Sequence, residues 1–333
     1  MIFAELLVML VVILIAAEVF TNALEHLGEK LGISEGVTGS LFAAVGTALP
    51  ETSVPLLALL AGTNDPHLNE EIGVGAILGA PLMLSTLSIS LLAFAVLKNR
   101  KASGHFHPEK TGLKRDFDIF NAAFAFATIA LFVPHEVMGV RYAIGFLMVL
   151  IYFIYILLTL SASKTLVASG HATEAQEPMF ICRLGLPNTM LVVALQLLIG
   201  LALLIAGAKG FISGIQDVSG ILGISPLLLS LLVIPIATEL PEKVNSVLWV
   251  RKGKDTLAFG NITGALVFQG TLLPAIGIML TPWVPQKEVF AGVVVTLLGV
   301  LWLRWMISRG QLRVWHVWVN GILYLIYLSL VLN

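Results

Sequence analysis

Charged residues are scarce in this chain, and cysteine is nearly absent. Of 333 residues only 12% are Asp, Glu, Lys or Arg, whereas 58% are hydrophobic, and the mean hydropathy is +0.96. Soluble domains carry about 25% charged residues. A soluble enzyme, a nucleic-acid-binding protein and a disulfide-stabilised secreted domain are therefore excluded. The single Cys182 cannot form a disulfide within the chain.

Apolar runs follow one another through the sequence instead. A helix needs about 20 apolar residues to cross a bilayer. We therefore predict an all-α polytopic membrane protein, embedded in lipid, with ten transmembrane helices. The first run lacks a basic start and carries Glu5 and Glu18, so we interpret it as a span and not as a signal peptide. The predicted spans are 2–24, 36–61, 71–97, 117–133, 138–161, 187–214, 226–250, 256–281, 288–307 and 313–332.

Basic residues concentrate in alternate connections between these spans. The connection after the third span is the richest, with Lys98, Arg100, Lys101, Lys110, Lys114 and Arg115. Loops rich in Lys and Arg stay in the cytoplasm. We therefore predict a multi-pass protein of the cell (inner) membrane, with cytoplasmic basic loops and both termini outside.

The sequence contains an internal repeat. The segment LGISEGVTGSLFAAVGTALPE at 31–51 aligns without a gap with LGISPLLLSLLVIPIATELPE at 222–242. Five predicted spans separate the two copies, and an odd number means that the second copy enters the membrane from the opposite side. We predict two inverted five-helix repeats, 1–161 and 187–333, joined by a cytoplasmic loop at 162–186. Inverted repeats with proline-interrupted helices are typical of secondary transporters.

Each repeat places a glutamate directly after a proline, about halfway along a span. These glutamates are Glu51 and Glu242. Because proline has no N–H donor, carbonyls one turn earlier, near Thr47 and Thr238, lose a hydrogen bond. Carbonyls and carboxylates are hard ligands that suit Ca²⁺ or Na⁺, and an acid at membrane depth indicates a functional site. We predict a central cation site at this pair; protonated glutamates bonded to neighbouring helices are the structural alternative.

The helices that follow carry small and amide side chains. Spans three and eight both open with Gly-x-x-x-Gly, at Gly75 and Gly79 and at Gly260 and Gly264. Small residues at this spacing let helices approach closely, so packing is the preferred interpretation. Span eight also carries Asn261 and Gln269, either of which can link helices or, for Gln269, bind an ion.

These motifs resemble the calcium:cation antiporter superfamily, which includes the membrane region of sodium/calcium exchangers. The family motif G-T-S-L-P-E reads GTALPE at 46–51 and ATELPE at 237–242. The second motif, G-N-x-x-G-S-N-x-x-[ND], reads GNITGALVFQ at 260–269. The resemblance covers nearly the whole chain. It implies that Glu51 and Glu242 bind a divalent cation.

The same resemblance implies further ligands. Thr47 and Thr238 occupy hydroxyl or carbonyl ligand positions, and Gln269 falls where the family has Asn or Asp. Other family ligands are missing: the serines are Ala48, Glu239, Ala80 and Ala265, and the Asn or Asp of the first repeat is Leu84.

The second repeat, which lacks the family serines, carries two additional charged residues. Glu239 adds an acid that can join the cation site, and Lys243 lies four residues later on the same helical face. The two residues can form a structural or gating ion pair. Alternatively, Lys243 stands in for a coupling cation beside Glu242.

These features favour a secondary active antiporter that exchanges Ca²⁺, or a similar cation, for Na⁺ or H⁺ by alternating access. Loss of ligands in the first repeat favours H⁺, and the family resemblance favours Na⁺. The alternatives are a transporter of the same fold for another solute and an intramembrane metalloenzyme. We expect no enzymatic activity, no cofactor beyond the transported ions and no nucleic-acid partner, and we expect one chain to suffice for transport.

One motif lies outside this hypothesis. The sequence GHFHPE places His105, His107 and Glu109 together in the basic loop after span three. Two histidines in a loop can bind a transition metal or simply be solvated.

Overall fold

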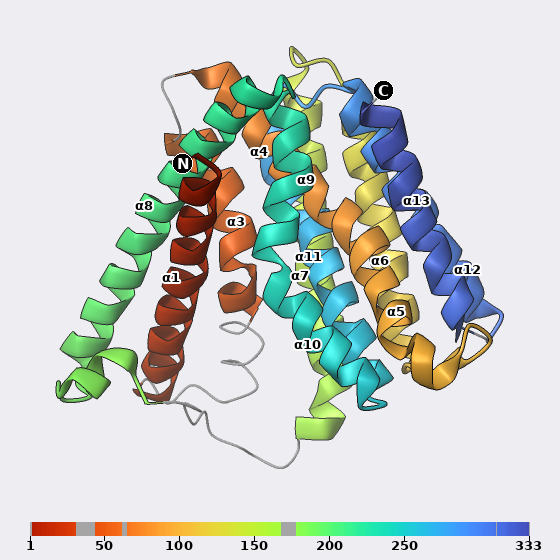
Figure 1. Ribbon diagram of the computed structural model, residues 1–333, viewed down its shortest axis with the longest axis horizontal. Coiled ribbons are helices and arrows are strands. Elements are labelled where there is room, and N and C mark those ends of the chain that lie inside the picture. Colours follow the sequence, from red (N-terminus) through yellow and green to blue (C-terminus); the bar gives the residue numbers. More distant parts are fainter. Residues whose placement is uncertain (1, 31–43, 62–64, 168–177, 311, 333) are drawn as a thin grey trace. The chain divides into compact units, whose positions relative to one another are not determined.

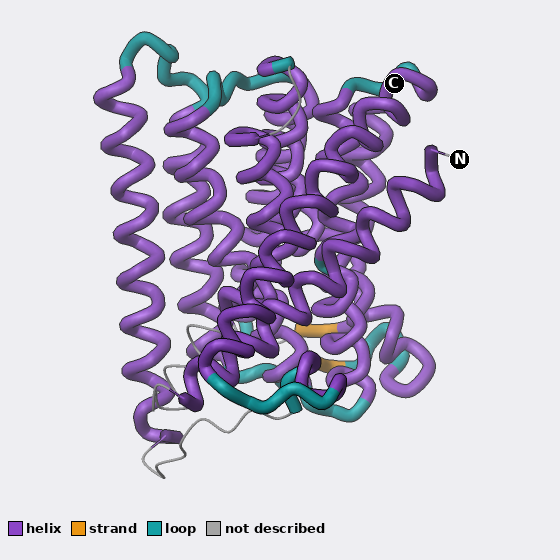
Figure 2. The backbone as a smooth tube through the Cα atoms, turned by 90° about the vertical axis from the view of Figure 1, so that its left-hand side faces the viewer, coloured by secondary structure: helices purple, strands orange, loops and turns teal. Residues whose placement is uncertain are grey.

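The computed structural model describes residues 2–30, 44–61, 65–167, 178–310 and 312–332, and almost all of this backbone is helical (Figure 2). The helices are α1 (Ile2–Lys30), α3 (Ala44–Ala61), α4 (Pro66–Met83), α5 (Ile89–Arg100), α6 (Lys110–Ala130), α7 (Met138–Val167), α8 (Met190–Leu222), α9 (Pro226–Thr238), α10 (Leu240–Arg251), α11 (Asp255–Leu280), α12 (Lys287–Ser308) and α13 (Val314–Leu332). A π-helix, η2 (Leu84–Ser88), joins α4 to α5, and η3 (Phe180–Leu184) is a 3₁₀-helix. Strands β1 (His105–Phe106) and β2 (Leu312–Arg313) pair antiparallel.

These helices fit the predicted membrane class. Each predicted span overlaps a described helix or run of helices. Within the described ranges, six stretches are long and apolar enough to cross a membrane: Pro66–Arg100, Met138–Thr159, Met190–Leu222, Ala258–Leu280, Lys287–Ser308 and Val314–Leu332. The protein is therefore a mostly helical, multi-pass membrane protein, while the count of ten spans stays a prediction. Helices α1, α7 and α8 continue past their predicted ends, because helical hydrogen bonding does not stop where apolar residues do.

The proline-containing spans differ from one another. Glu239 alone separates α9 from α10, with φ −88° and ψ 7°. Pro241 then lies in the first turn of α10, where its missing N–H has no helical partner to lose. Helix α3, by contrast, continues through Pro50 from Ala44 to Ala61. The predicted interruption is thus a break in one repeat and not in the other.

The chain divides into two compact units. Unit 1 comprises Met1–Asn69 and Leu157–Gly223, and unit 2 comprises Glu70–Ile156 and Ile224–Asn333. Each unit draws helices from both halves of the sequence. The compact units therefore do not coincide with the predicted repeats, 1–161 and 187–333, whose inverted relationship stays a prediction.

In unit 1, α1 and α8 lie side by side (Figure 1). A Cβ atom added at Gly200 would lie 2.9 Å from Phe20 Cβ, and one added at Gly207 would lie 3.0 Å from Ile13 Cγ1. One series of residue numbers rises as the other falls, so the two helices are antiparallel. Glycine at these positions permits an approach that a larger side chain would block.

In unit 2, the glycines of α4 pack against α9. A Cβ atom added at Gly79 would lie 2.2 Å from the Leu231 carbonyl oxygen, and one at Gly75 would lie 2.5 Å from that of Leu227. These distances agree with the packing interpretation of the first Gly-x-x-x-Gly pattern. The pattern in α11 differs, because no described atom lies within 4 Å of a Cβ added at Gly260.

Candidate functional site

The predicted cation ligands are divided between the two units. Glu51, on α3 of unit 1, is buried, with 4% of its surface exposed. The side chains of Thr47 and Glu242 lie outside the described residues. The predicted meeting of Glu51 with Glu242 therefore stays a prediction. The remaining members are all buried in unit 2: Thr238, Glu239, Lys243 and Gln269.

Glu239 occupies the break between α9 and α10 and forms an ion pair there. Lys243 Nζ lies 3.2 Å from Glu239 Oε2 and donates a 3.0 Å hydrogen bond to the Pro235 carbonyl. The same carbonyl accepts the backbone N–H of Glu239 at 3.3 Å. The exposed fractions of the Glu239 and Lys243 side chains are 1% and 8%. Each charge is therefore tolerated because the other neutralises it.

The hydroxyl of Thr238 lies one residue before this break. Its Oγ1 donates a 3.0 Å hydrogen bond to the Ile234 carbonyl, one turn earlier in α9. A hydroxyl that donates to its own helix keeps oxygen lone pairs for a further partner. Thr238 thus retains the chemistry of an oxygen ligand.

Gln269 is the buried amide of α11, with 2% of its surface exposed. Its Oε1 accepts no hydrogen bond from any residue that the structure describes. A buried acceptor without a donor costs about 1–3 kcal/mol, and a cation or a water molecule would remove that cost. Asn261 behaves differently, because its Nδ2 donates to Ser246 Oγ on α10 at 3.0 Å. Asn261 therefore links helices, whereas Gln269 offers a ligand oxygen.

The first repeat has a π-helix at the corresponding place. Leu84, which replaces the family ligand, begins the π-helix η2, and such turns are frequent at functional sites. Ser85 and Ser88 are buried in it. Asn320 on α13 donates a 2.6 Å hydrogen bond to the Ser85 carbonyl. Sequence analysis missed this polar turn, because neither composition nor spacing distinguishes a π-turn from an α-helix.

Asp116 is a second residue that sequence analysis missed. It lies one residue before the predicted start of span four, yet only 6% of its surface is exposed. Thr263 Oγ1 on α11 donates a 2.7 Å hydrogen bond to Asp116 Oδ2, and Arg115 Nη2 lies 3.5 Å from Oδ1. The one sequence feature that could have indicated a polar partner is Thr263, three residues after Gly260 in the second motif. Asp116 thus connects α6 to the helix that carries Gln269.

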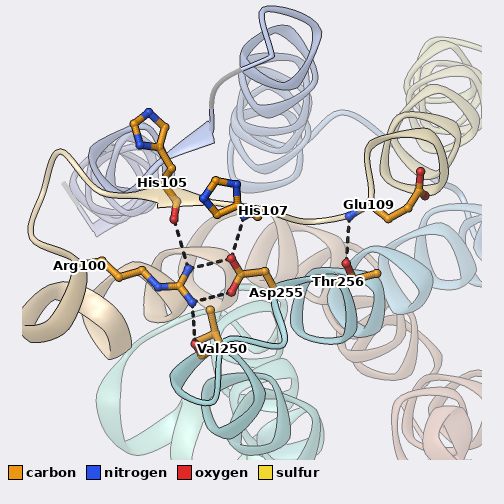
Figure 3. Close-up of polar contacts among 7 residues, drawn as sticks. All are labelled: Arg100, His105, His107, Glu109, Val250, Asp255 and Thr256. Carbon is orange, nitrogen blue, oxygen red and sulfur yellow. Dashed lines mark hydrogen bonds and ion pairs between the residues drawn. The ribbon is translucent and has the colours of Figure 1, made fainter.

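The start of α11 is held by a two-pronged ion pair (Figure 3). Arg100 Nη1 and Nη2, at the end of α5, lie 2.7 and 2.8 Å from the two carboxylate oxygens of Asp255. Arg100 also donates to the carbonyls of Val250 and His105, at 3.1 and 3.3 Å, and the His107 N–H donates to Asp255 Oδ2 at 2.8 Å. These bonds fix α11 to α5 and β1.

Comparison with known proteins identifies the family. The sodium/calcium exchanger protein family matches residues 1–161 and 192–333. The putative antiporter CaxA of Alkalimonas amylolytica is 24% identical over 288 residues, which cover 84% of this chain and 80% of CaxA.

Solved structures show the same fold. The H⁺/Ca²⁺ exchanger CAX superposes with a TM-score of 0.70 at 18% identity, covering 98% of this chain and 82% of CAX. The sodium-calcium exchanger NCX_Mj superposes with a TM-score of 0.56 at 18% identity, covering 99% of both chains. The chain belongs to the sodium/calcium exchanger family, within the calcium:cation antiporter superfamily that its repeat motifs resemble.

Proposed function

We propose that this protein is a secondary active antiporter that exchanges Ca²⁺, or a similar divalent cation, for a second cation by alternating access. Its ligands would be Glu51, Glu242, Thr47, Thr238 and Gln269. The observation that carries the proposal is the buried Gln269 Oε1, for which no described residue provides a donor. A hard cation is a suitable partner for such an oxygen. Family membership supports the same substrate class, as do the solved relatives, an H⁺/Ca²⁺ exchanger and a sodium-calcium exchanger.

We further propose H⁺ as the counter-ion. Sodium binding would need oxygen ligands, and the family serines are alanine at positions 48, 80 and 265. In addition, the Lys243 ammonium already contacts the Pro235 carbonyl and the Glu239 carboxylate. In this proposal the Lys243 ammonium, at the break between α9 and α10, takes the place of a bound monovalent cation. Glu239 would then neutralise Lys243 and would not bind the transported ion.

Alternating access would use the α1–α8 pair as a moving element. Support comes from the close antiparallel packing of these helices through Gly200 and Gly207 and from their place in one compact unit. Close packing lets the pair move as one body. In this proposal the ten spans form two inverted repeats, with both termini outside the inner membrane and the basic loops in the cytoplasm.

The test is uptake of radiolabelled Ca²⁺ by proteoliposomes, first under an imposed pH gradient and then under a Na⁺ gradient. We expect uptake with the pH gradient and its loss in Glu242→Gln. The matched control is Glu136→Gln, which changes an exposed loop glutamate and should leave uptake unchanged.

Each other outcome is decisive. No uptake under either gradient contradicts Ca²⁺ antiport and leaves transport of another solute as the alternative. Uptake under the Na⁺ gradient but not under the pH gradient contradicts H⁺ as the counter-ion. Unchanged uptake in Glu242→Gln contradicts the proposed ligands.

A further inference from the structure

We propose that His105 and His107 form a binding site for a transition-metal ion such as Ni²⁺, Cu²⁺ or Zn²⁺. Both residues belong to unit 2 and neither is a ligand of the proposed transport site. The inference does not rest on the proposed transport function.

His105 and His107 lie on either side of the buried Phe106 in an extended segment. Phe106 is 4% exposed and packs edge-on against Phe259, with ring centroids 5.1 Å apart. Successive side chains of a strand point to opposite faces, so His105 lies on the face opposite Phe106, and His107, directly after the strand, is exposed as well. In Figure 3 the His105 imidazole points away from the Arg100–Asp255 pair, and the His107 imidazole lies beside the chain.

The distance between the two rings suits a shared ion. Their centroids lie 6.3 Å apart. Imidazole nitrogens bind Zn²⁺ at about 2.0–2.1 Å, so at this separation an ion reaches one nitrogen of each ring along a nearly straight line between them. Small rotations about exposed side-chain bonds are enough to adjust the angle.

The backbone of both histidines is already held in place. The His105 carbonyl accepts a hydrogen bond from Arg100, and the His107 N–H donates to Asp255. Strand β1 also pairs with β2, with His105 opposite Arg313. A ligand pair whose backbone is fixed loses less conformational entropy when an ion binds.

The surroundings determine which ion would fit. Both histidines line a cavity of about 140 Å³ that is shared with Phe106, Pro108 and Lys110, so water can complete the coordination shell. Lys110 Nζ donates to the Gly310 carbonyl at 3.3 Å. The Glu109 carboxylate accepts the backbone N–H groups of Thr111 and Gly112 and is therefore engaged as a helix cap.

The ligand set is thus two imidazoles. Within the described part of the chain, no group of three or more His, Cys, Asp and Glu side chains is placed to hold a metal. Imidazole suits Zn²⁺, Cu²⁺ and Ni²⁺, whereas Ca²⁺ and Mg²⁺ require oxygen ligands. The site would therefore discriminate against the ion proposed for transport.

The test uses the purified full chain without an affinity tag. Thermal unfolding is followed with Ni²⁺, Cu²⁺ or Zn²⁺, and with Ca²⁺ or Mg²⁺ for comparison. We expect a transition metal to raise the Tm by about 2 °C or more. Electron paramagnetic resonance of bound Cu²⁺ should show nitrogen couplings from two imidazoles.

Variants locate the site. His105→Ala and His107→Ala should each weaken metal binding at least tenfold, and His105→Asn and His107→Gln serve if an alanine variant fails to fold. The control is His135→Ala, because His135 is an exposed loop histidine of the same unit. A metal affinity equal to that of the native chain in both the His105 and the His107 variants overturns the proposal. A Tm rise with Ca²⁺ equal to that with the transition metals also overturns it. No Tm rise with any of the three transition metals overturns it as well.

Discussion

Lys243 Nζ lies 3.2 Å from Glu239 Oε2 at the junction of α9 and α10. The spacing of four residues in the sequence indicates that the two side chains share a helical face. The spacing does not predict the second contact of this ammonium, a 3.0 Å hydrogen bond from Lys243 Nζ to the Pro235 carbonyl. The pair therefore stabilises an interrupted helix as well as neutralising two buried charges.

Removing the lysine alone should be costly. Lys243→Met removes the ammonium that lies 3.2 Å from the buried Glu239 carboxylate, and we expect a loss of about 3–5 kcal/mol in the free energy of unfolding. The double variant Glu239→Gln/Lys243→Met should recover most of it. Chemical unfolding in detergent measures both effects. Equal losses in the single and double variants would show that the ion pair does not provide the stability.

The hydrogen bond between Thr263 and Asp116 offers a second test. Thr263→Val removes the donor at 2.7 Å while keeping the shape of the side chain. We expect a loss of about 1 kcal/mol, the scale of hydrogen bonds between membrane helices. Thr263→Ser keeps the hydroxyl and should lose less. If the two variants unfold alike, the methyl packing and not the hydrogen bond is what Thr263 contributes.

The close approach of α4 to α9 makes a steric prediction. Gly79→Ala places a Cβ 2.2 Å from the Leu231 carbonyl oxygen, so the helices must separate, at a cost of about 1–3 kcal/mol. Gly139→Ala is the control, because no described atom lies within 4 Å of an added Cβ there. The Tm of Gly79→Ala should be lower than that of Gly139→Ala. Equal values would contradict close packing of α4 against α9.

Glu109 leads to a prediction about pH. Hydrogen bonds from the backbone N–H of Gly112, and then of Thr111, hold the Glu109 pKa below its ordinary value of 4.5. A carboxyl whose pKa is lower in the folded state stabilises the fold at pH values above its pKa in the unfolded state. This stabilisation is lost as the pH falls through its pKa in the folded state. The difference in Tm between the native chain and Glu109→Gln should therefore be largest at neutral pH and shrink below about pH 4.5. A difference that grows on acidification would contradict the cap.

Particular residues show how far sequence reasoning extends. Each predicted span overlaps a described helix, and the glycines of α4 pack as their spacing indicates. The pairing of Glu239 with Lys243 follows from helical periodicity. These features depend on neighbours along the chain, which the sequence states directly.

Other features depend on contacts between distant segments. Whether a proline interrupts its helix depends on what satisfies the freed carbonyls; Pro241 follows a break, whereas α3 continues through Pro50. Asp116 looks like a solvated helix-start acid until Thr263, 147 positions away, is placed beside it. The π-turn at Leu84–Ser88 is likewise invisible to periodicity.

By itself, the sequence determined that this protein is a multi-pass helical membrane protein with a family-like pair of Pro-Glu motifs, because hydropathy and repeats are properties of the chain. Only the tertiary structure decided which polar groups are already bonded. Lys243 and Asn261 have partners within unit 2, whereas Gln269 Oε1 has no donor among the described residues. The physical reason is that a buried polar atom must find a partner, and which partner it finds depends on helices far apart in the sequence.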